Sequence, residues 1–71
     1  MSKPKTQLKI GENIKTARLK LGATQGDIAK KAKISVNYYA RIERGEVNAS
    51  IETLESVLRA LNVKSSNILP F

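Results

Sequence analysis

The chain contains no cysteine and no histidine, and these two absences exclude several classes of function. Disulfide frameworks, nucleophiles activated by histidine and zinc sites with Cys or His ligands cannot be built from it. Only six carboxylates remain for acid–base or metal chemistry, and they are scattered along 71 residues. We therefore expect neither an enzyme nor a metal site, and we expect no cofactor.

Long apolar runs are also missing. No stretch approaches the roughly 18 consecutive apolar residues of a membrane-spanning helix, and the polar first six residues lack the apolar stretch of a signal peptide. These features predict a soluble cytoplasmic protein with no membrane partner. A chain of this length buries only about 60% of the surface that it exposes when unfolded, which indicates one small domain.

Positive charge is abundant and unevenly placed. Thirteen Lys and Arg residues oppose six Asp and Glu residues, for a formal charge of +7. Residues 1–33 hold nine of the basic and two of the acidic side chains, whereas residues 34–71 hold four of each. Such a field favours an anionic partner such as nucleic acid. We expect residues 1–6 to form a flexible basic arm and residues 7–71 to form a single domain.

Apolar residues recur at helical spacing along the whole chain, and no segment alternates as a strand would. The cap and stop residues define a first helix from Thr6 to Gly22, a second from Thr24 to Ala32, a third from Ser35 to Gly45, a fourth beginning at Asn48 or Ser50, and a short turn at 65–69. The expected buried stripes are Ile10, Ile14, Ala17 and Leu21 in the first helix, and Ile51, Leu54, Val57, Leu58 and Leu61 in the fourth. The pattern predicts an all-α, compact bundle of five helices.

The third helix presents an outer face suited to DNA. Steps of 100° per residue place Ser35, Tyr39 and Ile42 on the core side, and Asn37, Ala40 and Arg41 on the opposite side. Arg41 could bond guanine, Asn37 could bond adenine, and Val36 on the flank could touch a thymine methyl group. The alternative is that these side chains form an ordinary solvated surface.

Two helices joined by a tight turn at 33–34 have the spacing of a helix-turn-helix. The stretches that carry a family resemblance are 24–29 (Thr-Gln-Gly-Asp-Ile-Ala), 34–35 (Ile-Ser), 41–45 (Arg-Ile-Glu-Arg-Gly) and 48–54 (Asn-Ala-Ser-Ile-Glu-Thr-Leu). In their order and spacing they resemble the Cro/C1-type, XRE-like helix-turn-helix family of phage repressors and restriction-modification controllers. The resemblance implies a five-helix lambda-repressor-like domain of prokaryotic or phage origin, with helices 2 and 3 as the DNA-binding unit.

The resemblance also implies roles for individual residues. It implies that Gln25 binds a phosphate and braces the third helix, that Ser35, Val36, Asn37 and Arg41 face bases or the adjacent backbone, and that Tyr38 and Arg44 hold phosphates. Backbone amides from Asn48 to Ser50, at a helix N-terminus, would add a phosphate site. The structural alternatives are an ordinary helix-start residue for Gln25 and an aromatic side chain packed on the fourth helix for Tyr38.

Three positions depart from the family pattern, and at one of them Ala49 replaces a common proline. Lys33 occupies a turn position that is often glycine because the backbone there tends to be left-handed, and its charge could face a phosphate. Tyr39 stands where the family usually has Ile or Val, so its hydroxyl needs a partner or solvent.

Arg18 and Glu43 each border an apolar stripe, Arg18 on the first helix and Glu43 on the third. Opposite charges at the margins of two packed faces suggest each other as partners, and the resemblance implies the same ion pair. We expect Arg18 and Glu43 to bond and to lock the first helix to the third.

The sequence supports two main functional hypotheses. The first is a regulator of transcription, a repressor, that binds a palindromic DNA operator as a homodimer through the fourth and fifth helices and the C-terminus. The candidates for that interface are exposed Ile68, Leu69 and Phe71, and the alternative for Leu69 is a place in the core. The second is a protein-interaction module on the same scaffold, antitoxin-like or in contact with polymerase. Binding of a basic helix to a membrane surface is disfavoured because the apolar stripes already form a core. We expect either a complete small regulator or the DNA-binding part of a longer protein.

Overall fold

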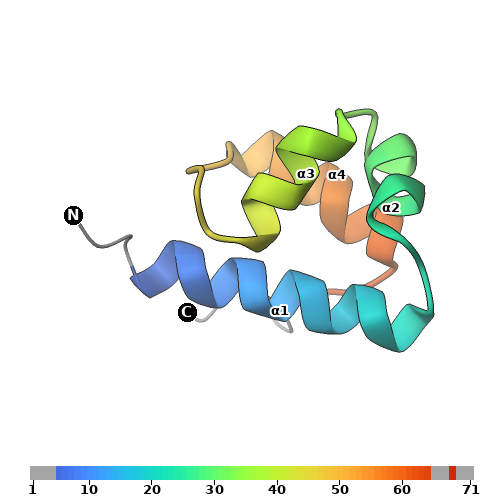
Figure 1. The fold of residues 1–71 in the computed structure, drawn as a ribbon, viewed down its shortest axis with the longest axis horizontal. Coiled ribbons are helices and arrows are strands. Elements are labelled where there is room, and N and C mark those ends of the chain that lie inside the picture. Colours follow the sequence, from blue (N-terminus) through green and yellow to red (C-terminus); the bar gives the residue numbers. More distant parts are fainter. Residues whose placement is uncertain (1–4, 65–67, 69–71) are drawn as a thin grey trace.

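The computed structural model describes residues 5–64 and residue 68, and every regular element in that part of the chain is a helix (Figure 1). The helices are α1 (Lys5–Leu21), α2 (Gln25–Ala32), α3 (Val36–Glu43) and α4 (Ile51–Leu61). The all-α prediction is confirmed. The expected fifth helix at 65–69 lies outside the described residues except for Ile68, so the count of five is not confirmed. Because α1 already includes Thr6, the prediction of that residue as its cap is wrong.

The helices begin at the side chains that the sequence predicts. The Thr24 hydroxyl accepts a hydrogen bond from the Asp27 amide at 3.0 Å, and the Asp27 carboxylate accepts one from the Thr24 amide at 3.0 Å. Ser35 and Ser50 cap α3 and α4 in the same way, each accepting from the amide three residues later. These bonds satisfy backbone donors that the first turn of a helix leaves without partners.

All four helices also end alike, in a Schellman motif. Just beyond each helix one residue has a positive φ, and the amide after it donates to a carbonyl five residues earlier. The positive φ angles are 75° at Gly22, 61° at Lys33, 71° at Gly45 and 57° at Asn62. The closing bonds run from Ala23 to Arg18, Ile34 to Ala29, Glu46 to Arg41 and Val63 to Leu58. The left-handed backbone expected at Lys33 is confirmed.

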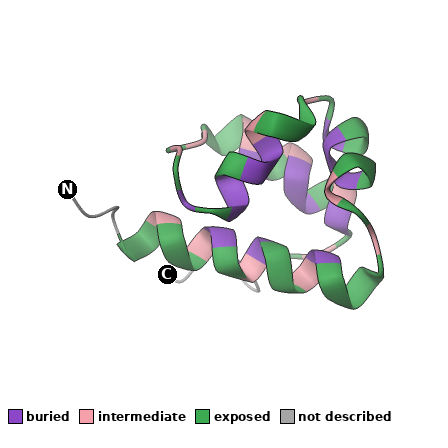
Figure 2. Ribbon diagram, viewed as in Figure 1, coloured by how far each residue is buried: buried purple, intermediate pink, exposed green. Residues whose placement is uncertain are grey.

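The core lies where α1 and α2 pack against α3 and α4 (Figure 2). Its largest fully buried side chains are Tyr39, Ile14, Ile28, Leu61 and Val57. Two residues expected in the buried stripes are instead exposed, Leu21 by 52% and Ile51 by 67%. They are the last residue of α1 and the first of α4, so the neighbouring helices do not cover them.

Two glycines allow α1 to cross the end of α3 closely. A Cβ atom on Gly11 would lie 2.5 Å from the carbonyl oxygens of both Ile42 and Glu43. A Cβ on Gly45 would lie 2.8 Å from a methyl carbon of Leu8. Gly11, whose helix-weakening effect is evident from sequence, is therefore required by packing. The contact fixes α3 against α1.

Candidate nucleic-acid interface

The outer face of α3 carries Val36, Asn37 and Arg41, and all three are exposed. Tyr39 and Ile42 are buried on the opposite side, as the helical wheel predicts. The same wheel is wrong for two residues. Ser35 is exposed because it is the N-cap and stands outside the helical turn, and Ala40 is buried although the wheel places it on the outer side.

A buried ionic network holds α3 to its neighbours. The Arg18 guanidinium donates from Nε to Glu43 Oε2 at 2.7 Å and from Nη2 to Glu43 Oε1 at 3.2 Å. The two side chains are only 10% and 2% exposed. Gln25 donates from Nε2 to Glu43 Oε1 at 2.9 Å. The predicted ion pair is thus present, and one carboxylate joins α1, the first residue of α2 and the last residue of α3.

The surroundings keep this network ionised. Burial by itself would raise the pKa of Glu43, but the hydrogen bonds from Arg18 and Gln25 outweigh it and hold the pKa below its ordinary 4.5. The hydrogen bond to Glu43 raises the pKa of Arg18. Burial also raises the pKa of Tyr39, which remains neutral. Its hydroxyl makes no hydrogen bond of ordinary geometry within residues 5–64 and 68.

Two arginines beside the outer face share one carboxylate. Arg44 donates from Nε to Glu46 Oε2 at 2.8 Å and from Nη2 to Glu46 Oε1 at 3.2 Å. Arg41 Nε lies 3.6 Å from Glu46 Oε1. The hydrogen bond to Glu46 raises the pKa of Arg44. Sequence reasoning missed Glu46; its only signal was its place directly after the helix-stopping Gly45.

The other residues predicted to bind DNA lie before, within or after α3 in the sequence. Lys33 is exposed in the turn before α3, and Asn48 is exposed in the loop before α4. Gln25 is half-buried because its amide reaches Glu43. Tyr38 is also half-buried and packs against the core. No hydrogen bond or ion pair within residues 5–64 and 68 joins Lys33 or Asn48 to Arg41 or Arg44, so Lys33 and Asn48 lie near the outer face of α3 but are not part of the arginine network.

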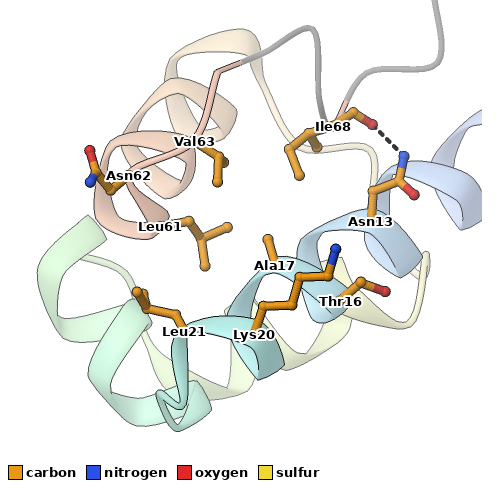
Figure 3. A pocket seen from close by; sticks show the side chains of 9 residues that line it. All are labelled: Asn13, Thr16, Ala17, Lys20, Leu21, Leu61, Asn62, Val63 and Ile68. Carbon is orange, nitrogen blue, oxygen red and sulfur yellow. Dashed lines mark hydrogen bonds between the residues drawn. The ribbon is translucent and has the colours of Figure 1, made fainter.

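A groove of about 610 Å³ lies elsewhere, between α1 and the end of α4 (Figure 3). Its walls include Ala17, Leu61 and Val63, with Lys20 as the charged side chain and no carboxylate among the lining residues. None of the predicted DNA-binding residues lines it. The lining offers no pair of groups for acid–base chemistry.

Ile68 forms one wall of this groove, and its position corrects a prediction. The residue was expected on an exposed dimer surface, but it is buried in the core and its carbonyl accepts a hydrogen bond from Asn13 at 2.7 Å. Ile68 and Leu61 belong to the same buried apolar cluster, and both side chains line the groove (Figure 3). Leu69 and Phe71, the other expected contributors, lie outside the described residues.

Residues 5–64 and 68 hold neither a bilayer-spanning helix nor a cluster of metal ligands. No helix among them combines the length and the apolar character needed to cross a bilayer. No three acidic, His or Cys side chains within residues 5–64 and 68 come together as metal ligands would.

Comparisons with known proteins point to one family. A model of the helix-turn-helix family matches residues 14–67. The immunity repressor protein of Bacillus phage phi105 is 42% identical over 60 residues, which cover 84% of this chain and 42% of that protein. The crystal structure of the clp gene regulator ClgR from C. glutamicum is similar with a TM-score of 0.89 and 27% identity, over 94% of this chain and 86% of the other.

A second solved structure is the restriction-modification controller protein C.Esp1396I, crystallised as a tetramer in complex with its natural 35 base-pair operator. It is similar with a TM-score of 0.85 and 33% identity, over 90% of this chain and 84% of the other. The chain spans about half the length of the curated relatives that it matches, from 42% to 54%. The likeness to those relatives therefore concerns their helix-turn-helix part.

Proposed function

The chain belongs to the helix-turn-helix family, and we propose on this basis that it is a sequence-specific DNA-binding regulator of transcription that acts as a repressor. The observation that carries the proposal is the outer face of α3. Asn37 and Arg41 are one helical turn apart, exposed, and mounted on a helix whose other side is buried. The relatives named as an immunity repressor and as transcriptional regulators support the same function.

In this proposal α3 lies in the major groove. Arg41 bonds a guanine edge through two donors, Asn37 bonds an adenine edge, and Val36 contacts a thymine methyl group. Ser35 contacts a base or the adjacent backbone from the first turn. Because the Arg18–Glu43 pair and Gln25 fix α3 from behind, the base-reading side chains start from a rigid support.

Phosphate contacts surround the reading helix and set its register on the duplex. Lys33 before α3 and Arg44 after it carry the necessary positive charge. Tyr38 offers a hydroxyl and Gln25 a side-chain amide to the backbone, while Asn48 and the amides up to Ser50 stand at the N-terminus of α4. These contacts supply affinity that does not depend on sequence.

We further propose that the protein binds a two-fold operator as a homodimer. One copy of α3 contacts too few base pairs to define a unique site in a genome. Two copies on half-sites about one helical turn apart read twice as many base pairs. The operator complex of the similar controller protein, crystallised as a tetramer, supports assembly on DNA. The proposed contact uses α4 and the C-terminal residues beyond the buried Ile68.

The test is selection of binding sites from a random duplex DNA library at about physiological salt. We expect the unaltered protein to enrich a two-fold motif. The double variant Asn37→Ala, Arg41→Ala should lose that motif because it lacks both base-reading side chains. Lys15→Ala is the matched control, since it removes one positive charge from the exposed side of α1 and should retain the motif.

The outcomes separate the proposal from its main alternative. A motif that survives in the double variant would contradict the assignment of α3 as the reading helix. No enrichment by folded, unaltered protein would contradict sequence-specific binding and favour the second hypothesis, a protein-interaction module that contacts a toxin or polymerase. A motif without two-fold symmetry would contradict the dimer.

A further inference from the structure

Glu46 is held beside the two arginines by the way α3 ends. Gly45 takes a positive φ of 71°, which turns the chain back, and the Glu46 amide donates to the Arg41 carbonyl at 2.9 Å. The backbone of Glu46 is therefore anchored to the same residue whose side chain its carboxylate approaches. The carboxylate meets both guanidinium groups, at 2.8 Å from Arg44 and 3.6 Å from Arg41.

The contact with Arg44 occupies the part of the guanidinium that a phosphate would use. Nε and Nη2 donate side by side to the two carboxylate oxygens. A phosphate group accepts from the same pair of donors with two of its oxygens. The carboxylate and the phosphate therefore compete for one edge of Arg44. Glu46 also places a negative charge where the DNA backbone would bring more, which opposes the approach of any duplex.

From this geometry we propose that Glu46 is an internal competitor of DNA phosphates for Arg41 and Arg44, and that it lowers affinity for non-operator DNA more than affinity for the operator. The inference rests on the proposed function. A non-operator duplex offers only phosphate in exchange for the Glu46 contacts. On the operator, Arg41 binds a base edge through its two terminal amino groups and can keep the contact of its Nε with Glu46 Oε1, 3.6 Å away. Operator binding then displaces Glu46 from Arg44 alone, so the free-energy cost of displacing Glu46 is smaller on the operator.

The arginines are about half exposed, so the competition is mild and reversible. Exposed ion pairs are weak because water and salt screen them and because ordering two long side chains costs entropy. Glu46 thus shifts the balance between two classes of DNA without preventing binding. Its effect should appear as a change in the ratio of two dissociation constants.

The experiment measures binding of Glu46→Gln and of the unaltered protein to two duplexes by fluorescence anisotropy at about physiological salt. One duplex is the selected operator and the other has a scrambled sequence of the same length. We expect Glu46→Gln to bind the scrambled duplex about two- to fivefold more tightly. We expect a smaller gain on the operator, so the specificity ratio falls. Circular dichroism confirms that the variant is folded.

Glu12→Gln is the matched control. It removes the same charge and also breaks a surface ion pair, since Glu12 Oε1 lies 3.9 Å from Lys9 Nζ on α1. Equal gains in the two variants would show that only net charge matters, which overturns the proposal. Weaker binding by Glu46→Gln would show that the carboxylate orients the arginines, and unchanged binding would show that it does neither; both overturn it.

Failure of sequence-specific binding and failure of the proposed competition give different results in this experiment. If the unaltered protein does not distinguish the two duplexes, sequence-specific binding fails, and with it the claim about specificity. A gain on the scrambled duplex by Glu46→Gln alone would in that case still support competition with phosphate. A gain that is equal on operator and scrambled duplexes would overturn the discrimination while leaving sequence-specific binding intact.

Discussion

Glu43 ties α3 to two other segments of the chain. Its carboxylate accepts from Arg18 and Gln25, so three segments of the chain meet at one side chain. A buried ion pair is not by itself strong evidence of stability, because removing two charges from water is costly. Removing one partner alone is nevertheless destabilising, since the other charge stays buried without a counter-ion.

Stability should therefore depend on pH in the acid range. The pKa of Glu43 in the folded protein lies below its ordinary 4.5. Its contribution is thus fully present above about pH 4.5 and is lost as the pH falls through the folded pKa. We expect urea unfolding to show a free energy that is flat near neutral pH and falls below about 4.5. Glu43→Gln should lower stability by about 3 kcal/mol at neutral pH and weaken the acid dependence.

Asp27→Asn controls for another carboxylate with a lowered pKa. Hydrogen bonds from Thr24 lower the pKa of Asp27, so this exposed cap residue acts in the same direction and pH range. The asparagine variant should keep most of the acid dependence. A free energy of unfolding that rises on acidification would contradict the assignment of the acid dependence to Glu43. A pH dependence of stability in Glu43→Gln as steep as that of the unaltered protein would contradict it too.

Helix boundaries were the most predictable elements because short-range bonds determine them. Thr24, Ser35 and Ser50 each accept from an amide three residues later, and this pattern is visible in sequence. Burial at helix ends was not predictable in the same way. Leu21 and Ile51 follow the apolar spacing yet are exposed, because spacing does not indicate where the neighbouring helix stops.

The crossing of α1 and α3 gives a prediction at the scale of elements. Gly11→Ala should destabilise the protein although alanine favours helix, because its Cβ would lie 2.5 Å from two backbone carbonyl oxygens. We expect a loss of about 1–3 kcal/mol in thermal or urea unfolding. Gly26→Ala is the matched control in α2, where the nearest atom is Thr24 Oγ1 at 3.7 Å. The free energy of unfolding of this control should rise by about 0.5–1 kcal/mol, because alanine has a higher helix propensity than glycine. Equal effects of the two changes would contradict the close crossing.

The sequence predicted the ion pair of the candidate site but not the contacts of Glu46. Arg18 and Glu43 could be paired because each borders a regular apolar stripe, so helix geometry brings them together. The contacts of Glu46 could not be predicted, since they depend on the path of an irregular loop after Gly45. Packing of α1 and α3 sets that path, and no local pattern in the sequence describes it.

At the scale of the whole molecule the excess of positive charge should govern how binding responds to salt. Each phosphate contact that releases counter-ions adds about 0.9 to the slope of log affinity against log salt. Lys33→Gln should reduce that slope by about 0.9, because it removes a proposed phosphate contact. Asn37→Ala should weaken operator binding and leave the slope unchanged, since the amide carries no charge. Titrations between about 50 and 200 mM salt measure both. A slope altered equally in the two variants would contradict the division into phosphate and base contacts.

The shared manner in which the four helices end has a consequence for how fast the chain folds. Each Schellman motif closes through bonds between residues three to five positions apart, and the caps of α2, α3 and α4 span three. The boundaries of the helices can therefore form without first closing long loops. Small helical proteins, in which many contacts are local, fold in about microseconds to milliseconds. We expect this chain to fold in that range, so that α3 is held in place almost as soon as the helices around it have formed.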